Sequence, residues 1–275
     1  MPGVFFNCQE SAVMIEFVKS VAVRAGKLAL YEQSCMNSSN IHRKDTDKDL
    51  VTDADRKVEQ FIISELKKCY PDFDVLGEES GMSANKSEYC WIIDPIDGTT
   101  SFAHGFPQWS VSIGLHRNGE PLLGVVYAPV FDELYYAEAG RGAYCNGVRL
   151  TVSKRDKLID SIATFGIFCV RAGWTEEENM KFASRLAPQL CDIRKCGSAA
   201  LDFCYIARGI GDAYWELALM PYDFAAGMLI VTEAGGRVSD LYGGDEFPQK
   251  GIICTNGLIH EQMLANFYDF QNLRR

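Results

Sequence analysis

Four acidic residues of this chain follow turns or apolar runs, where a rigid scaffold can present side chains to a ligand. Asp94 and Asp97 come directly after the apolar run Trp-Ile-Ile, and Glu78 and Asp223 stand in two other turn-like positions. Mg²⁺ prefers hard oxygen ligands and usually binds one or two carboxylates together with substrate phosphate and water. Four carboxylates can hold two Mg²⁺ ions, a pair that activates water and stabilises the leaving oxygen in displacement on phosphorus.

A phosphate-binding element follows the first two carboxylates. The segment Gly98-Thr99-Thr100 has the composition of a helix start, and the free N–H groups of a helix start attract phosphate oxygens. Each feature alone has a plainer explanation, since Asp-Pro and Asp-Gly are common turn dipeptides. Asp223 alone would be a helix cap and Glu78 a solvated turn residue. Their occurrence together favours a site for metal and phosphate.

The spacing of apolar residues predicts the elements that position these side chains. Trp91 to Ile93 form a short buried strand that delivers Asp94, and Pro95 then ends the pairing because it has no amide hydrogen. Asn-Gly pairs at 118–119 and 146–147 predict hairpin turns. Further strands are predicted at 73–76, 109–116, 122–128, 133–138, 161–165, 192–195, 212–217 and 252–255, and helices at 10–33, 52–69, 175–187, 197–208, 222–234 and from about 258.

This alternation of elements indicates an α/β (α+β) fold with alternating layers of helix and sheet. We expect one compact unit with a soft division into an N-terminal half, 1–150, and a C-terminal half, 151–275. Most of the acidic candidates fall in the first half and Asp223 in the second. The polar residues 34–49 predict a mobile loop.

Composition excludes several other classes of protein. The chain has 275 residues, 47% of them hydrophobic, and a net charge of −10 without a basic run, which argues against a nucleic-acid-binding face. No apolar run approaches the ~20 residues that cross a bilayer, and the first ten residues do not read as a signal peptide. The ten cysteines form no Cys-x-x-Cys motif, so we expect reduced thiols in the cytoplasm rather than a zinc site.

The order of the motifs resembles the inositol monophosphatase family of Mg²⁺-dependent, Li⁺-sensitive sugar phosphatases. Trp91 to Phe102 matches the first family signature and Tyr222 to Gly236 the second. Asp49 to Thr52 and Gly77 to Ser80 match motifs upstream of them, so the resemblance spans roughly residues 10–267. It implies a layered α-β-α-β-α sandwich, a homodimer, and two to three Mg²⁺ ions as cofactors.

The resemblance also implies the ligands of each ion. Glu78, Asp94 and the backbone carbonyl of Ile96 would hold the first Mg²⁺. Asp94, Asp97 and Asp223 would hold the second, with Asp94 bridging, and a third, weaker ion would lie near Glu78. The nucleophile would be a metal-activated water, so no covalent phosphoenzyme is implied.

Further residues are matched to the substrate and to the attacking water. Gly98 and Thr99 would offer backbone N–H groups to the phosphate, and the Thr99 hydroxyl, paired with Asp55, would orient the water. Lys44 matches a loop lysine near the metals, although a solvated charge is the plainer interpretation of it. The positions matched to sugar hydroxyl contacts are Gly197, Ser198, Ala199 and Glu216.

Two signature positions depart from the family pattern, and both leave the carboxylates in place. Ser101 replaces the usual Asn and Tyr222 the usual Trp, so we expect catalysis to survive. Met220 and the segment 166–173 fall where family members vary with substrate. Inositol 1-phosphate is the expected substrate among the sugar and polyol phosphates.

Other substrates of the family stay as alternatives. Fructose 1,6-bisphosphate requires a cation for its second phosphate, which Arg171, Arg194 or Lys195 could supply. Histidinol phosphate and NADP are further alternatives, and 3′-phosphoadenosine 5′-phosphate is disfavoured because the insertions of that branch are missing. An alternative of another class is a regulatory protein that binds a partner in transcription; the intact set of carboxylates favours the enzyme.

Overall fold

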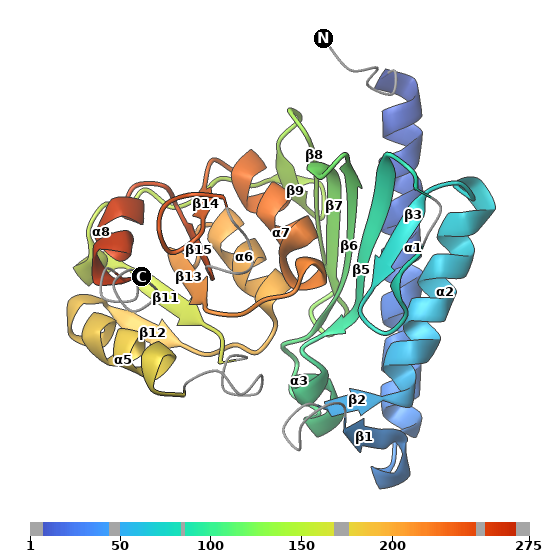
Figure 1. Ribbon diagram of the computed structural model, residues 1–275, viewed down its shortest axis with the longest axis horizontal. Coiled ribbons are helices and arrows are strands. Elements are labelled where there is room, and N and C mark those ends of the chain that lie inside the picture. Colours follow the sequence, from blue (N-terminus) through green and yellow to red (C-terminus); the bar gives the residue numbers. More distant parts are fainter. Residues whose placement is uncertain (1–7, 44–49, 84–85, 168–175, 246–250, 268–275) are drawn as a thin grey trace.

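The fold is a stack of five alternating layers of helix and sheet (Figure 1). The structure is a computed structural model and describes residues 8–43, 50–83, 86–167, 176–245 and 251–267. The layered α-β-α-β-α sandwich expected from the sequence is confirmed. Within these ranges, no helix is both long enough and apolar enough to span a bilayer.

The first sheet has eight strands in the order β10-β9-β8-β7-β6-β5-β3-β4. Its pairs are antiparallel except for β3 and β5, which run parallel. The strands are β3 (Asp74–Gly77), β4 (Gly81–Met82), β5 (Tyr89–Asp97), β6 (Ser110–Arg117), β7 (Glu120–Ala128), β8 (Glu133–Glu138), β9 (Ala143–Cys145) and β10 (Val148–Arg149). The helices α1 (Cys8–Cys35) and α2 (Asp53–Cys69) cover its outer face (Figure 1). Their apolar side chains form one core with Trp91 and Ile93 of β5.

The second sheet has five strands in the order β12-β11-β13-β15-β14. They are β11 (Ile162–Phe165), β12 (Asp192–Arg194), β13 (Ala213–Glu216), β14 (Arg237–Ser239) and β15 (Ile252–Thr255). On its outer face lie α5 (Glu176–Leu186) and α8 (His260–Leu264), which pack against Trp215 and Ile253. The predicted strand at 252–255 is confirmed residue for residue.

Two helices, α6 (Ala199–Ala207) and α7 (Pro221–Glu233), fill the layer between the sheets (Figure 1). Small residues let α7 lie close to its neighbours. A Cβ at Gly124 of β7 would stand 2.6 Å from the carbonyl oxygen of Ala226, and a Cβ at Gly227 would stand 2.8 Å from Phe203 of α6. This close packing places the first turn of α7 beside the end of β5.

Two local predictions are wrong. The polar stretch 34–49 is not simply a loop, because Ser38–Asn40 form a short 3-10 helix and β1 (Ile41–Arg43) pairs antiparallel with β2 (Leu50–Thr52). Pro95 does not end its strand either, since β5 runs to Asp97. The ladder shifts register after Asp94 and resumes where Asp97 pairs with Ser110, so the missing amide is absorbed by a local irregularity.

Both predicted hairpin turns are confirmed. Asn118 and Gly119, between β6 and β7, have φ values of 50° and 87°, and Asn146 and Gly147, between β9 and β10, have 49° and 82°. Two consecutive positive φ angles characterise the tight turn that matches the twist of the flanking strands.

Candidate metal centre

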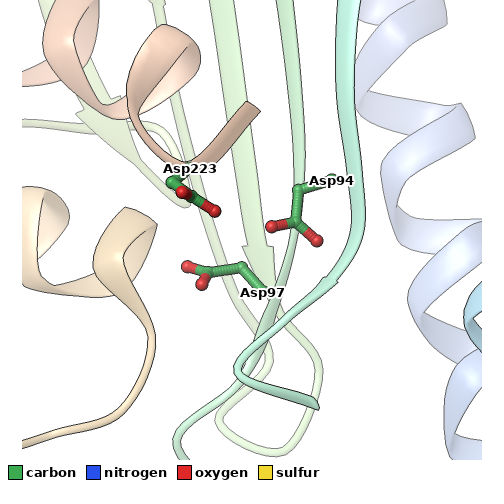
Figure 2. Close-up of side chains that lie close together, drawn as sticks. All are labelled: Asp94, Asp97 and Asp223. Atoms are coloured by element: carbon green, nitrogen blue, oxygen red, sulfur yellow. The ribbon is translucent and has the colours of Figure 1, made fainter. Parts of the chain in front are cut away.

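Three carboxylates, Asp94, Asp97 and Asp223, converge on one space between the two sheets (Figure 2). Each offers an oxygen, and these oxygens lie within 4.8 Å of one another. In a regular strand, residues three positions apart point to opposite faces. The register shift after Asp94 breaks this alternation and lets Asp94 and Asp97 face the same space. Within the described ranges, this is the group of side chains able to hold a metal ion.

Asp223 is positioned by the start of α7. Met220 precedes the helix in extended conformation, and Pro221 occupies its first turn, where a missing amide hydrogen costs nothing. The Asp223 carboxylate accepts a hydrogen bond of 2.7 Å from the Met220 amide. Met220 is the N-cap and Asp223 the third residue of the helix, so Asp223 satisfies the N-cap amide from inside the helix while its carboxylate lies close to Asp94 and Asp97.

Asp97 joins the first sheet to the start of α6. Its carboxylate accepts hydrogen bonds from the Ser198 hydroxyl at 2.6 Å and from the amides of Ala199 and Ala200 at 3.2 and 2.6 Å. Ser198 in turn caps α6 by accepting from the amide of Leu201. The start of this helix therefore binds a protein carboxylate.

Burial and mutual repulsion raise the pKa values of these carboxyls. Desolvation is the main cause for Asp94 and Asp223, and both pKa values lie well above the usual range; the charge of Glu78 adds to the effect at Asp94 and that of Asp97 at Asp223. Burial raises the pKa of Asp97 to about 7, although the hydrogen bonds from Ser198 and α6 oppose the shift. Buried, mutually repelling oxygen ligands fit a hard divalent cation, which would neutralise them.

Glu78 and Ile96 line the same cavity. Glu78 follows β3, and its amide donates to the carbonyl of Ile93 at 3.2 Å. The amide of Ile96 donates to Asp94 at 3.0 Å, while its carbonyl accepts from the Thr99 hydroxyl at 3.2 Å. Glu78 is not part of the 4.8 Å group.

Thr99 and Asp55 form a second polar pair beside the carboxylates. The Thr99 hydroxyl donates to Asp55 at 3.2 Å. Asp55 is fixed by Thr52, the N-cap of α2, whose amide and hydroxyl donate to it at 2.7 and 2.6 Å. Burial raises the pKa of Asp55 to about 7, a value at which a carboxyl can exchange protons near neutral pH.

Gly98 stands at the N-terminus of the short helix α3 (Thr99–His104) in the left-handed region, with φ of 95°. A Cβ there would lie 3.0 Å from the carbonyl oxygens of Gln108 and Gly197. Both the conformation and the space therefore require glycine, and the chain can turn from β5 into α3 beside Asp97.

The three converging carboxylates line a cavity of about 490 Å³ together with Glu78 and Thr99. It is also lined by the predicted substrate positions Gly197, Ser198, Ala199 and Glu216. Glu216, at the end of β13, is 4% exposed. Lys44 lies outside the described residues.

Sequence reasoning did not select Tyr214 and Asp202, which also line the cavity. Tyr214 lies two positions before Glu216 in β13, and the period of two in a strand places both on one face, so this signal was available. Asp202, in α6, carries no comparable signal, because a carboxyl four positions after a cap is common on helix surfaces.

Fold and cavity together define a class of protein, one in which layers of helix and sheet surround an acidic group able to hold a metal ion. Comparison with known proteins is more specific. The family model described as "Inositol monophosphatase family" matches residues 10–271, and the chain belongs to that family. Membership makes the protein a metal-dependent phosphatase.

Relatives in this family carry several names. The chain is 41% identical over 218 residues to an inositol-1-monophosphatase of Mesorhizobium japonicum, covering 78% of this chain and 82% of the relative. It is 39% identical to a fructose-1,6-bisphosphatase/inositol-1-monophosphatase of Thermotoga maritima, with coverages of 82% and 85%. It is 40% identical to the Nus factor SuhB of Pseudomonas aeruginosa, with coverages of 88% and 90%.

A solved structure supports the fold directly. The extragenic suppressor protein suhB from Bartonella henselae aligns with a TM-score of 0.86 at 37% identity. The alignment covers 93% of this chain and 98% of that one. The layered arrangement is therefore that of the family, while the names of the relatives leave several substrates open.

Proposed function

We propose that this protein is a Mg²⁺-dependent phosphomonoesterase that hydrolyses inositol 1-phosphate to inositol and phosphate. The observation that carries the proposal is the convergence of Asp94, Asp97 and Asp223 in one cavity with Glu216. The family description and the names of two relatives support the same substrate.

In this proposal one set of residues binds the metal ions and a second set binds the phosphate. Glu78, Asp94 and the Ile96 carbonyl would hold one Mg²⁺, and Asp94, Asp97 and Asp223 a second, with a third, weaker ion near Glu78. Bound there, Mg²⁺ supplies a Lewis acid for the phosphoryl oxygens and acidifies a water. The amides of Gly98 and Thr99 would bind the phosphate oxygens.

Thr99 and Asp55 orient the attacking water. The Thr99 hydroxyl donates to Asp55, so its oxygen lone pairs can accept a hydrogen bond from water. The water oxygen forms the new bond to phosphorus as the ester P–O bond breaks, and the leaving alkoxide takes a proton from solvent water. Asp55, with a pKa raised to about 7 by burial, can accept the water's proton through Thr99 at neutral pH.

Glu216 and the Gly197-Ser198-Ala199 turn would contact the hydroxyls of the leaving group. A buried carboxylate that accepts hydrogen bonds from vicinal hydroxyls loses that partner when the substrate lacks them. Such pockets discriminate strongly against analogues without the hydroxyl. The wall formed by Leu219 and Met220 completes this side of the cavity.

Fructose 1,6-bisphosphate is a second candidate because Lys195 lines the cavity. Arg194 is committed to an ion pair of 2.7 Å with Asp192, and Arg171 lies outside the described residues. Lys195 is therefore the cation placed to meet a second phosphate, and the Thermotoga maritima relative is named for this activity as well.

The proposal also covers the localisation, the Li⁺ sensitivity, the oligomeric state and the partners of the protein. We place the protein in the cytoplasm as a Li⁺-sensitive homodimer, without direct nucleic-acid binding. A regulatory role through a protein partner is the alternative from another class, and the relative named Nus factor SuhB supports it. The converging carboxylates favour turnover, since a purely regulatory role does not require them.

The test is phosphate release with Mg²⁺ from inositol 1-phosphate, fructose 1,6-bisphosphate, histidinol phosphate, NADP and 3′-phosphoadenosine 5′-phosphate, each with and without Li⁺. Preference for inositol 1-phosphate, suppressed by Li⁺, supports the proposal in full. Preference for another ester replaces the substrate and keeps the mechanism. Release from none of them would shift the weight to the regulatory role.

A further inference from the structure

Tyr214 lies directly beside Glu216 in the wall of the cavity. The two side chains share one face of β13, and the Tyr214 hydroxyl donates a hydrogen bond to a Glu216 carboxylate oxygen. Tyr214 is fully buried, and its ring packs against Phe203 of α6 with centroids 5.4 Å apart. A donor on a ring fixed in this way holds its acceptor in one place.

Gly166 bounds the same carboxylate from the neighbouring strand. It follows β11, which runs parallel to β13 with Phe165 opposite Trp215, and its amide donates to the carbonyl of Trp215 at 3.1 Å. A Cβ at Gly166 would stand 1.7 Å from one Glu216 carboxylate oxygen and 2.0 Å from the carboxyl carbon. The backbone of Gly166 has no positive φ, so glycine is required here by space and not by conformation.

We propose that Tyr214 is a positioning residue that holds the Glu216 carboxylate in one orientation, that Gly166 leaves the space which this orientation occupies, and that this orientation selects phosphate esters of polyhydroxylated alcohols. The inference rests on the proposed function and specifies its substrate class. A glutamate side chain loses substantial rotamer freedom when it is ordered. The Tyr214 hydrogen bond imposes that order before the substrate arrives, in the space that Gly166 leaves open, so the ester's hydroxyls meet a preorganised acceptor.

The test is the variant Y214F, which removes a single hydroxyl. KM and kcat are measured with inositol 1-phosphate and with p-nitrophenyl phosphate, whose leaving group carries no alcohol hydroxyls. We expect KM for inositol 1-phosphate to rise roughly tenfold, the effect of one hydrogen bond to a charged group. Both parameters for p-nitrophenyl phosphate should stay within about twofold of wild type.

A matched control is Y135F. Tyr135 is also fully buried and donates to a glutamate, Glu133, at 2.7 Å, but it belongs to β8 and does not line the cavity. Y135F should leave the ratio of the two KM values unchanged. G166A tests the other side of the carboxylate and should raise KM for inositol 1-phosphate without raising it for p-nitrophenyl phosphate.

A double variant shows whether Tyr214 acts through Glu216. If it does, Y214F should raise KM less than about twofold in an E216Q background, because residues in one contact are not additive. Full additivity, or an equal loss with both esters in Y214F and in G166A, would overturn the inference. A wild-type protein that hydrolyses neither ester would refute the proposed function and the inference with it. If the wild type is active and Y214F has the same ratio of KM values for the two esters as wild type, the inference alone is refuted.

Discussion

The substitution D94N tests the metal assignment because it changes charge with little change in shape. Asp94 is 2% exposed and accepts a hydrogen bond from the Ile96 amide at 3.0 Å, which an asparagine oxygen can also accept. The change removes one negative charge from a group whose members repel one another. We therefore expect metal-free D94N at pH 8 to be at least as stable as wild type.

The pH dependence of the metal-free wild type has a defined sign. The carboxyls of Asp94, Asp97 and Asp223 have folded-state pKa values above the ordinary 3.8. At pH values between 3.8 and these raised pKa values, the folded state therefore binds more protons than the unfolded state. Stability therefore falls as pH rises. For Asp97, whose pKa burial raises to about 7, this loss develops between the ordinary value of 3.8 and pH 7.

Mg²⁺ should restore this stability in the wild type. At 100 times its dissociation constant, a ligand of the folded state contributes about 2.7 kcal/mol, which for a chain of this size corresponds to a rise in Tm of about 5 to 8 °C. The rise should be larger at pH 8 than at pH 6. In D94N it should fall below about 1 °C, and turnover should fall by at least about a hundredfold.

The assay is thermal unfolding with and without Mg²⁺ at pH 6 and pH 8, together with phosphate release. D74N is the control, because Asp74 is a buried carboxylate of β3 that accepts from Ser83 and Ser87. It should lower Tm and leave the Mg²⁺-dependent rise intact. Wild-type turnover or a wild-type Mg²⁺ response in D94N would refute the metal assignment, and metal-free stability that grows from pH 5 to pH 8 would refute the electrostatic reasoning.

Three further substitutions probe other parts of the cavity. E216Q should change the ratio of kcat/KM between esters more than it changes overall activity, and an unchanged profile across the substrate panel would contradict a contact with sugar hydroxyls. K195A should lower kcat/KM for fructose 1,6-bisphosphate up to about fivefold, the effect of one exposed ion pair; an equal loss with inositol 1-phosphate would argue against a second phosphate site. S198A should raise the Mg²⁺ concentration for half-maximal activity and lower stability by about 1 kcal/mol, because Ser198 both caps α6 and donates to Asp97; a Mg²⁺ titration identical to wild type would exclude that link.

The elements predicted well from sequence are those with local signals. The hairpin turns at Asn118-Gly119 and Asn146-Gly147 depend on a few adjacent residues, and each stands where the sequence indicates. The long amphipathic helix at 10–33 is found at Cys8–Cys35. Periodicity suffices in these cases because the buried face repeats every turn.

Features that depend on distant segments could not be predicted in the same way. No local pattern shows that Ser198 donates to Asp97, or that Gly166 must leave room for Glu216. The continuation of β5 through Pro95 depends on its pairing with β6. The missing amide hydrogen of Pro95, taken alone, therefore predicted the wrong end for this strand. The residues alone brought the four carboxylates together as candidate metal ligands, and the family resemblance supplied their assignment to individual ions.

The helical layer shared by the two sheets has a consequence for how the chain folds. Asp94 and Asp97 belong to the first sheet, whereas Asp223 begins a helix of the shared layer and lies far along the chain. The three carboxylates therefore meet only when α7 has docked on the first sheet, a step that requires closing a long loop. Without a cation, that docking brings three carboxyl groups together whose oxygens lie within 4.8 Å of one another. The metal ion proposed for catalysis would thus also stabilise the folded state, because it binds the assembled carboxylates and not a partly docked intermediate.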